Sequence, residues 1–388
     1  MLRDFAPGDS PSCDCRHTSG TLPPGQRVIY NPGGLPFTEE TDSMPLSRPI
    51  ALTLALAAGL AAFVATAGCD AARTAPAGRG LKTGHFDLSP EARRLLPRGA
   101  VLYYSKSVTT SFKDWWAIEE LNVDTGHTRE IISTDTSGLI SLQPYSVSPD
   151  NRHILVSGRA KKGSPALFEL DLKSGAWRKI MDNAVSGYYS PDGSMIVLYT
   201  SQGDTEATVS HRVYVINRSG KIIHRIPCAS RSCYHPYWSP DGSSVIYVDD
   251  DRKIYFYSIA QKIRRVIIEE PQPQEKMISY PIFCSGKIIY FSQDRKRKYS
   301  RVLGYTVRHS RLRLLLPGST SSSDLGDFTD IVGFTCIPTL SRVIAVRDVR
   351  GQGLHLVLLQ LRPKQVTRLI PPHPSRLMYI NPVLTVRQ

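Results

Sequence analysis

Short apolar runs alternate with polar turns along most of the chain, and one such arrangement occurs three times. In each copy an apolar run containing aromatic residues leads into a Ser-Pro-Asp corner, and a β-branched apolar run follows. The copies read YSVSPDNRHILVS at 145–157, YYSPDGSMIVLYT at 188–200 and HPYWSPDGSSVIYV at 235–248. Short apolar runs bounded by turn residues predict β-strands, so each copy predicts two strands joined at a tight corner.

The corner residues have a conformational explanation. Pro fixes φ for the second position of a β-turn, Asp bonds to nearby backbone N–H groups, and Gly tolerates the exit geometry. We therefore interpret the repeated Asp as structural and not as a repeated catalytic group. The predicted turn residues are Pro149, Asp150, Pro191, Asp192, Gly193, Pro240, Asp241 and Gly242.

The spacing of the copies predicts the architecture. A period of roughly forty to fifty residues built from short strands is typical of a β-propeller. Two eroded units follow, SYPIFCSGKIIYFS at 279–292 and IVGFTCIPTLSRVIAVRD at 331–348. Inner strands are expected near Gln143, Gly187, Pro236, Tyr280, Ile331 and Tyr379, and the strands after them near Val101, Ile154, Met195, Ser244, Lys287 and Arg342.

The two ends of the repeat region are complementary. The first unit has three outer strands without an inner one, and the chain ends on YINPVLTVRQ, an inner strand without outer ones. We therefore predict an all-β fold, a six-bladed β-propeller over 98–388, whose C-terminal strand closes the first blade and removes exposed sheet edges. Before it, DLSPEARRLLP at 87–97 predicts a short helix with Ser89 as N-cap and Pro90 in its first turn.

The N-terminal region is organised as an export signal. Residues 1–43 are rich in Pro, Gly and polar residues and are interpreted as disordered or as a mis-called extension. Residues 44–68, with Arg48 and the apolar stretch Ile50–Val64, predict a signal peptide. Cys69 at its end predicts lipidation, with cleavage after Ala65-Thr66-Ala67 or an uncleaved helix as alternatives. Residues 69–97 are then the tether and short helix.

Charge narrows the range of partners. The net charge is +14, and residues 69–388 carry 44 Lys and Arg against 28 Asp and Glu. Such a chain favours anionic surroundings, namely phospholipid headgroups, acidic polysaccharide or an acidic protein. An exported chain is not expected to bind nucleic acid.

The cysteines suggest one disulfide. Cys228 and Cys233 are close enough in sequence to close a small loop in an oxidising compartment, with free thiols as the alternative. Cys284 and Cys336 are expected to be free, buried and apolar in character. No Cys or His spacing typical of zinc sites occurs.

Catalytic fingerprints are missing from the sequence. No G-x-S-x-G, H-E-x-x-H, P-loop or dinucleotide motif occurs, and we expect no cofactor and no metal. His235 could reach the channel as a ligand, although a lone His is usually a satisfied polar residue. The run Asp249-Asp250-Asp251 is interpreted as a turn because EF-hand spacing is absent. The pair Trp115-Trp116 is expected to pack in the core, with a sugar-binding platform as the alternative. Tyr237 and Trp238 are expected to pack between blades, with a place in the channel lining as the alternative.

Basic residues cluster in loops that a propeller places on one face. In this fold, the loops between second and third strands share a face with the loops that link blades. A basic cluster there could bind an anionic partner, or could be an ordinary solvated surface. The candidate binding residues are Lys161, Lys162, Arg252, Lys253, Arg295, Lys296, Arg297, Lys298, Arg347 and Arg350.

The YWSPDG phrase resembles the repeat of the TolB-type β-propeller family. The resemblance covers residues 98–388 and implies a propeller fold and, from the periplasmic TolB of the Tol envelope system, a location in the cell envelope. TolB itself carries an α/β domain before its propeller, whereas only residues 70–97 separate Cys69 from the predicted propeller here.

Two functions from different classes fit the sequence. The first is a non-catalytic, exported, membrane-tethered propeller that binds an envelope protein or peptide at its loop face. The alternative is a metal-dependent lyase for an anionic polysaccharide. A lyase would need three or four His, Gln or Asp side chains at the channel, and Gln143 and His235 are the obvious candidates, with His153, His211 or His309 able to complete the set.

Overall fold

The computed structural model describes two units. In the first, Met1–Val64, it describes the antiparallel strands β1 (Ile29–Tyr30) and β2 (Pro36–Phe37). In the second, it describes residues 82–386 except 87, 110–113, 203–209, 251, 272, 297, 301–304, 308, 317, 320, 330–333, 338–341, 350–352, 361–364 and 370–376. The predicted signal peptide and Cys69 lie outside the described residues. No helix within these ranges is long and apolar enough to cross a membrane.

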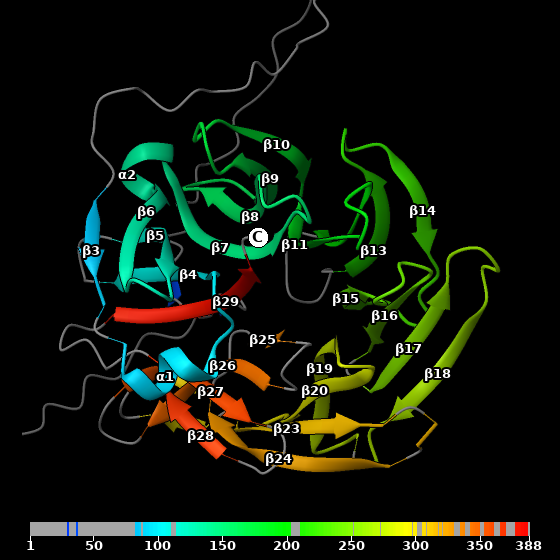
Figure 1. Ribbon diagram of the computed structural model, residues 1–388. Coiled ribbons are helices and arrows are strands. Elements are labelled where there is room, and N and C mark those ends of the chain that lie inside the picture. The colour runs from blue at the N-terminus through cyan, green and yellow to red at the C-terminus, as the bar shows by residue number, and fades with distance from the viewer. Residues whose placement is uncertain are drawn as a thin grey trace, which may run out of the picture. The chain divides into compact units, whose positions relative to one another are not determined.

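Six antiparallel sheets are arranged around a central axis as the blades of a β-propeller (Figure 1). From the axis outward, blade 1 consists of β29 (Leu377–Val386), β4 (Ala100–Thr109), β5 (Asp114–Asn122) and β6 (His127–Ser133). Blade 2 consists of β7 (Leu139–Val147), β8 (His153–Ala160), β9 (Pro165–Asp171) and β10 (Trp177–Asp182). Blade 3 consists of β11 (Ala184–Tyr189), β12 (Met195–Gln202), β13 (Ser210–Asn217) and β14 (Ile222–Ile226).

The second half of the ring repeats the same order. Blade 4 consists of β15 (Cys233–Trp238), β16 (Ser244–Asp249), β17 (Lys253–Ser258) and β18 (Arg264–Glu269). Blade 5 consists of β19 (Lys276–Cys284), β20 (Lys287–Asp294), β23 (His309–Leu315) and β24 (Ser322–Thr329). Blade 6 consists of β25 (Phe334–Ile337), β26 (Arg342–Val349), β27 (Gly353–Gln360) and β28 (Gln365–Arg368). The predicted six-bladed fold is confirmed.

The C-terminal strand completes the first blade. β29 pairs antiparallel with β4, with Val386 opposite Ala100 and Leu377 opposite Val108. A feature that the sequence did not predict lies on the outer edge of the same blade. There β3 (Thr83–His85) pairs with β6 and makes this sheet five-stranded.

Three smaller elements accompany the blades. Helix α1 (Pro90–Leu95) has the predicted N-cap, because Ser89 Oγ accepts a hydrogen bond of 3.1 Å from the Ala92 backbone N–H. Ala92 is fully buried in the apolar cluster between blades 1 and 6. A short helix, α2 (Thr134–Ser137), links blades 1 and 2, and the hairpin β21 (Lys298–Ser300) and β22 (Tyr305–Val307) is inserted in blade 5.

The Ser-Pro-Asp corners share one hydrogen-bond arrangement. In the second copy, Ser190 Oγ donates to Asp192 (2.5 Å) and accepts from the Met195 backbone N–H (2.9 Å), and Asp192 accepts from the Ser194 backbone N–H (3.1 Å). Equivalent bonds occur at the corners of Asp150 and Asp241. Hydrogen bonds from these serines are the main cause that lowers the pKa of all three Asp side chains. These Asp residues stabilise their turns, as predicted from the sequence.

Two disulfides occur among the residues that the structure describes, and one of them corrects the sequence analysis. Cys284 and Cys336 form a disulfide, so the expectation that both are free is wrong. They lie on β19 and β25, the inner strands of adjacent blades, whose Cα atoms approach to 5.5 Å at this point. A cross-link that closes a loop of this length lowers the conformational entropy of the unfolded chain. The folded protein is thereby stabilised by about 4 kcal/mol. Cys228 and Cys233 are joined by the second disulfide.

Candidate functional site

A pocket of about 260 Å³ lies on the axis of the propeller, and all six inner strands contribute to its wall. Most of its lining residues belong to the second halves of these strands, toward the Ser-Pro-Asp corners. The lining residues are Pro144–Val147, Tyr188, His235–Tyr237, Tyr280–Ile282, Phe334–Cys336 and Pro382–Thr385. Among the residues that the structure describes, no Asp, Glu, Lys or Arg lines this pocket.

Aromatic rings from successive blades meet in the pocket. The ring centroids of Tyr145 and Tyr188 are 6.0 Å apart, and those of Tyr188 and Tyr237 are 4.9 Å apart. The rings of His235 and Tyr280 approach to 3.8 Å between centroids. The result is a nearly continuous aromatic wall contributed by blades 2 to 5.

Proline residues aim these side chains inward. Pro236, Pro281 and Pro382 each lie within a β-bulge, where the register of the inner strand shifts against its neighbour. Pro cannot donate to the ladder, and a bulge re-aims the side chains beside it. The residues before two of these prolines, His235 and Tyr280, adopt φ of +50°. The repeated X-Pro in the inner strands is the signal by which the sequence could have revealed this pocket.

Burial keeps the pocket uncharged. Desolvation lowers the pKa of His235 to about 3, with a smaller contribution from the nearby His211. Desolvation also raises the pKa of Tyr188 and of Tyr237. At neutral pH the imidazole and both phenols are therefore neutral, and the phenols remain hydrogen-bond donors.

The histidine set that a channel metal would need is only partly assembled. His211 and His235 contact the same two rings, Tyr199 and Tyr234, at centroid distances between 4.9 and 5.9 Å. Desolvation is also the main cause that lowers the pKa of His211.

The other candidates do not join this pair. His153 lies instead 3.7 Å from Asp171, and Gln143 accepts a hydrogen bond from Tyr145. The side chain of His309 lies outside the described residues. Within the described ranges, no group of three His, Cys, Asp or Glu side chains could hold a metal.

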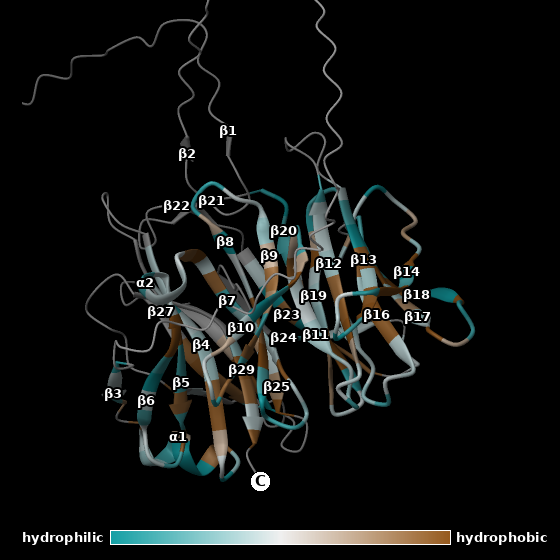
Figure 2. Cartoon of the chain, turned by 90° about the horizontal axis from the view of Figure 1, so that it is seen from above, coloured by the Kyte–Doolittle hydropathy of each residue, from teal (hydrophilic) through white to brown (hydrophobic). Residues whose placement is uncertain are grey.

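The described members of the predicted basic set do not line the pocket. They adjoin the ends of the second strands, whereas the pocket lies toward the Ser-Pro-Asp corners, where the second strands begin. Figure 2 shows the two sides of the ring, with the hairpin of β21 and β22 on one side and the C-terminal end of the chain on the other. Arg252 lies 3.9 Å from Asp250, Lys253 lies 3.1 Å from Glu269, and Arg295 donates to the Pro273 carbonyl at 2.6 Å. The exposed members are Lys161, Lys162, Arg252 and Lys296, and the side chains of Arg297, Lys298, Arg347 and Arg350 lie outside the described residues.

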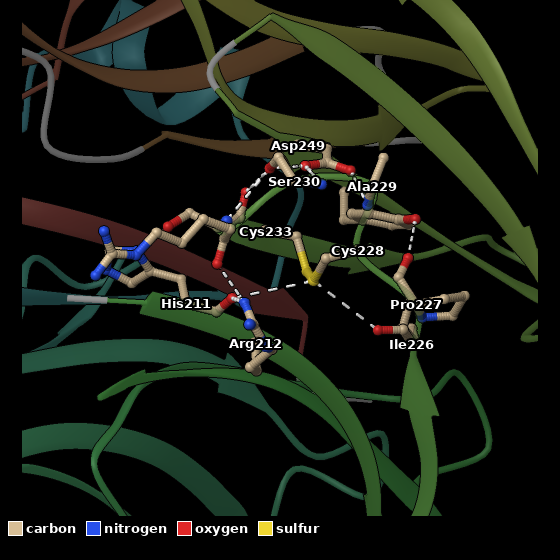
Figure 3. The surroundings of a disulfide bond; sticks show 12 residues. His211, Arg212, Ile226, Pro227, Cys228, Ala229, Ser230, Cys233 and Asp249 are labelled. Carbon is tan, nitrogen blue, oxygen red and sulfur yellow. Dashed lines mark hydrogen bonds between the residues drawn. A yellow bond between two sulfur atoms is a disulfide. The ribbon is translucent and has the colours of Figure 1, made fainter. Parts of the chain in front are cut away.

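In the run Asp249-Asp250-Asp251, the first residue stabilises a neighbouring loop. Asp249 accepts hydrogen bonds from the backbone N–H groups of Ala229 (2.5 Å) and Ser230 (3.1 Å), and also from the Ser230 hydroxyl (Figure 3). These bonds hold the segment closed by the Cys228–Cys233 disulfide against the end of β16. Asp251 lies outside the described residues.

Trp116 and Trp238 have the predicted packing roles, whereas Trp115 lies in none of the apolar clusters that the described residues form. Trp116 packs against the apolar cluster between blades 1 and 2. Trp115 donates through its indole N–H to Asp135 at 3.0 Å. Trp238 is buried and donates to the Tyr188 carbonyl at 3.0 Å, which links blade 4 to blade 3 next to the pocket.

The fold is shared with solved propeller structures. No family model and no curated protein matches the chain. The structure of TolB from Acinetobacter baumannii is similar at a TM-score of 0.57 and 14% identity, over 74% of this chain and 66% of that one. An oligogalacturonate lyase from Vibrio parahaemolyticus gives a TM-score of 0.45 at 14% identity, over 75% and 85%.

A second lyase structure, an oligogalacturonate lyase in complex with manganese, gives a TM-score of 0.46 at 11% identity, over 75% of this chain and 84% of that one. At these identities the likeness shows the fold alone, which is that of a TolB-like propeller. The chain spans about two thirds of the TolB structure.

The pKa of His235 predicts how stability changes with pH. Between pH 6.5 and 3 the unfolded chain binds a proton at His235 and the folded chain does not, so stability falls as pH falls, by up to about 1.4 kcal/mol per unit. His235→Asn removes this titration, and Asn tolerates the positive φ. We expect the free energy of unfolding, measured by urea denaturation, to fall between pH 7 and pH 4 by about 3 kcal/mol less in the variant than in the wild type. If both proteins lost the same free energy of unfolding, the claim that His235 is buried in its neutral form would be contradicted.

Proposed function

We propose that this protein is an exported, membrane-tethered, TolB-like propeller that binds a segment of a protein or peptide in the cell envelope and carries out no catalysis. The observation that carries the proposal is the axial pocket, which is neutral, lined by aromatic and proline side chains and built by all six inner strands. A preformed apolar concavity with a few polar groups is the usual form of a binding site.

The pocket chemistry favours a peptide segment. Its volume of about 260 Å³ suits one or two side chains and not a large cofactor. Aromatic walls bind proline and other apolar side chains, and neutral phenols can donate to the peptide carbonyls between them. The raised pKa values of Tyr188 and Tyr237 keep both phenols available as donors at neutral pH.

The same lining disfavours the polysaccharide lyase. A sugar carboxylate that entered this pocket would lose its hydration, and burial of an unpaired charge is costly. Among the described lining residues there is no Lys or Arg to pair with it. The closeness of His211 to His235 is the one feature in the lyase's favour, and it supplies two imidazoles without a third ligand in the described ranges.

Export and tethering are supported by the sequence. The apolar stretch Ile50–Val64 ends in small residues and Cys69, which fits a lipidated N-terminus after cleavage. Two disulfides in the propeller fit an oxidising compartment outside the cytoplasm.

Photo-crosslinking tests the binding function. A benzophenone amino acid at Tyr237 of the 69–388 protein should crosslink an envelope protein, and mass spectrometry then identifies the attached segment. A synthetic peptide of that segment should bind the wild type and lose about 2 kcal/mol, roughly thirtyfold in affinity, with Tyr188→Ala, because the aromatic wall is broken. Tyr214→Ala, a half-buried Tyr of the same blade outside the pocket, is the matched control.

Two results would contradict the proposed function. In the first, crosslinks form from position 162 in the basic loops and none form from position 237. In the second, the protein cleaves an acidic oligosaccharide to an unsaturated product, as followed by ultraviolet absorbance.

Lipidation makes a separate prediction. Cells that express the full chain with an alkyne-labelled fatty acid should label the wild type and leave Cys69→Ser unlabelled and free of the membrane fraction. Cys13→Ser is the matched control, since Cys13 precedes the predicted signal peptide. Label that survives Cys69→Ser would show that the tether is not a lipid on this residue.

A further inference from the structure

The outer edge of blade 4 has an unusual surface. The residues that begin β18 and the turn before it combine basic and aliphatic side chains, all exposed, and we call them the basic–apolar edge: Lys262, Ile263, Arg264, Arg265 and Val266. Ile263 is 58% exposed and Val266 is 46% exposed. On the same rim of the propeller (Figure 1), β14 of blade 3 exposes Ile222 and Ile223. Ile263 and Val266 lie three residues apart at the start of one strand, and exposed apolar surface of this kind is typical of interaction sites.

The backbone of β18 is available for pairing. β18 is the last strand in the order β15-β16-β17-β18, and no further strand pairs with it in the part of the chain that the structure describes. Such an edge presents unpaired N–H and C=O groups, which natural proteins usually protect. Here the first three residues of the strand, Arg264 to Val266, are exposed on both faces.

Blade 1 shows that the outer edge of a blade in this ring can accept a fifth strand. There β3 pairs antiparallel with β6, with Gly84 opposite Thr128. Each blade has the same four-stranded plan, so β18 occupies in blade 4 the position that β6 occupies in blade 1. The geometry for an added strand is therefore present in the fold.

The charges at this edge define the chemistry of the added strand. The guanidinium of Arg264 lies 4.9 Å from the Tyr255 ring centroid and that of Arg265 lies 4.6 Å from the Phe256 centroid. Arg264 also donates to the Pro227 carbonyl at 3.3 Å. Within the described ranges, no ion pair involves Lys262, Arg264 or Arg265. The arginines are thus positioned on aromatic rings without a neutralising carboxylate.

We propose that β18 binds an extended segment of another protein, in which two consecutive acidic residues adjoin an aliphatic one, as the fifth strand of blade 4. Acidic side chains would lie opposite Arg264 and Arg265, and an aliphatic side chain would lie opposite Val266, as favourable cross-strand pairs. A second copy of this chain is a less favourable occupant, because each chain carries a net charge of +14 and two copies repel one another. This surface is separate from the axial pocket and does not rest on the proposed function.

Hydrogen exchange on the intact protein tests the proposal. A short peptide of repeated Glu-Glu-Val should slow the exchange of the amides of residues 264–267 and leave the inner strands unchanged. Its affinity, measured by fluorescence anisotropy at low ionic strength, should fall about tenfold when alternate peptide nitrogens are methylated, because ladder hydrogen bonds are lost. It should also fall at least tenfold with the double variant Lys262→Glu and Arg265→Glu.

The control variant is Arg152→Glu with Lys173→Glu, the same change in charge on exposed turns of blade 2, and it should bind the peptide as the wild type does. Three results would overturn the proposal. One is no protection of β18 at millimolar peptide. Another is equal loss of binding in both double variants, which would indicate only general charge. The third is binding to phosphatidylglycerol vesicles through Lys262 and Arg265 without peptide protection, which would assign the edge to a membrane surface.

Discussion

The pairing of β29 with β4 joins the two ends of the propeller. The paired residues are 269 to 286 positions apart in the chain, and the pairing turns an open row of sheets into a ring. The first Ser-Pro-Asp corner reinforces it. Where the later corners have Gly193 and Gly242, this corner has Asn151, whose amide donates to the Val386 carbonyl at 3.2 Å and whose carbonyl accepts from Thr385. The pairing covers the inner edge of β4, which would otherwise be exposed.

Ring closure also determines the pocket. Because β29 completes the circle of inner strands, its residues Pro382 to Thr385 supply one side of the pocket wall. Prolines in β15, β19 and β29 break the regular ladder and aim side chains at the axis. Burial then keeps His235 and the tyrosines neutral. A site built in this way selects ligands by shape and apolar contact, while the charge of the chain is displayed on its loops and outer edges.

Local sequence patterns, namely the turn motifs and the apolar runs, predicted most of the fold. Contacts between different blades could not be predicted from these patterns. The Ser-Pro-Asp corners and apolar runs located the second strands to within one residue, as at Met195, Ser244, Lys287 and Arg342. The Cys284–Cys336 disulfide was missed because it depends on two inner strands that are neighbours only in the ring. β3 was missed because three residues carry too little periodicity.

The candidate site was harder to predict than the fold. The sequence singled out His235 and Tyr237, and both line the pocket, but it drew attention to basic loops whose described members do not line it. Side-chain direction in a bulged strand depends on backbone geometry that charge patterns do not reveal. The X-Pro pairs were visible in the sequence, and their meaning became clear only when four of them converged on one cavity.

Native-state hydrogen exchange across the inner strands tests most directly whether ring closure holds the pocket together. If it does, amides of β29 and β4 exchange at the same free energy as those of β15 and β16, because a closed ring opens only when the whole propeller unfolds. Exchange of β29 amides at a free energy several kcal/mol lower would contradict the account. It would show a strand that detaches on its own and a pocket wall that is absent for part of the time.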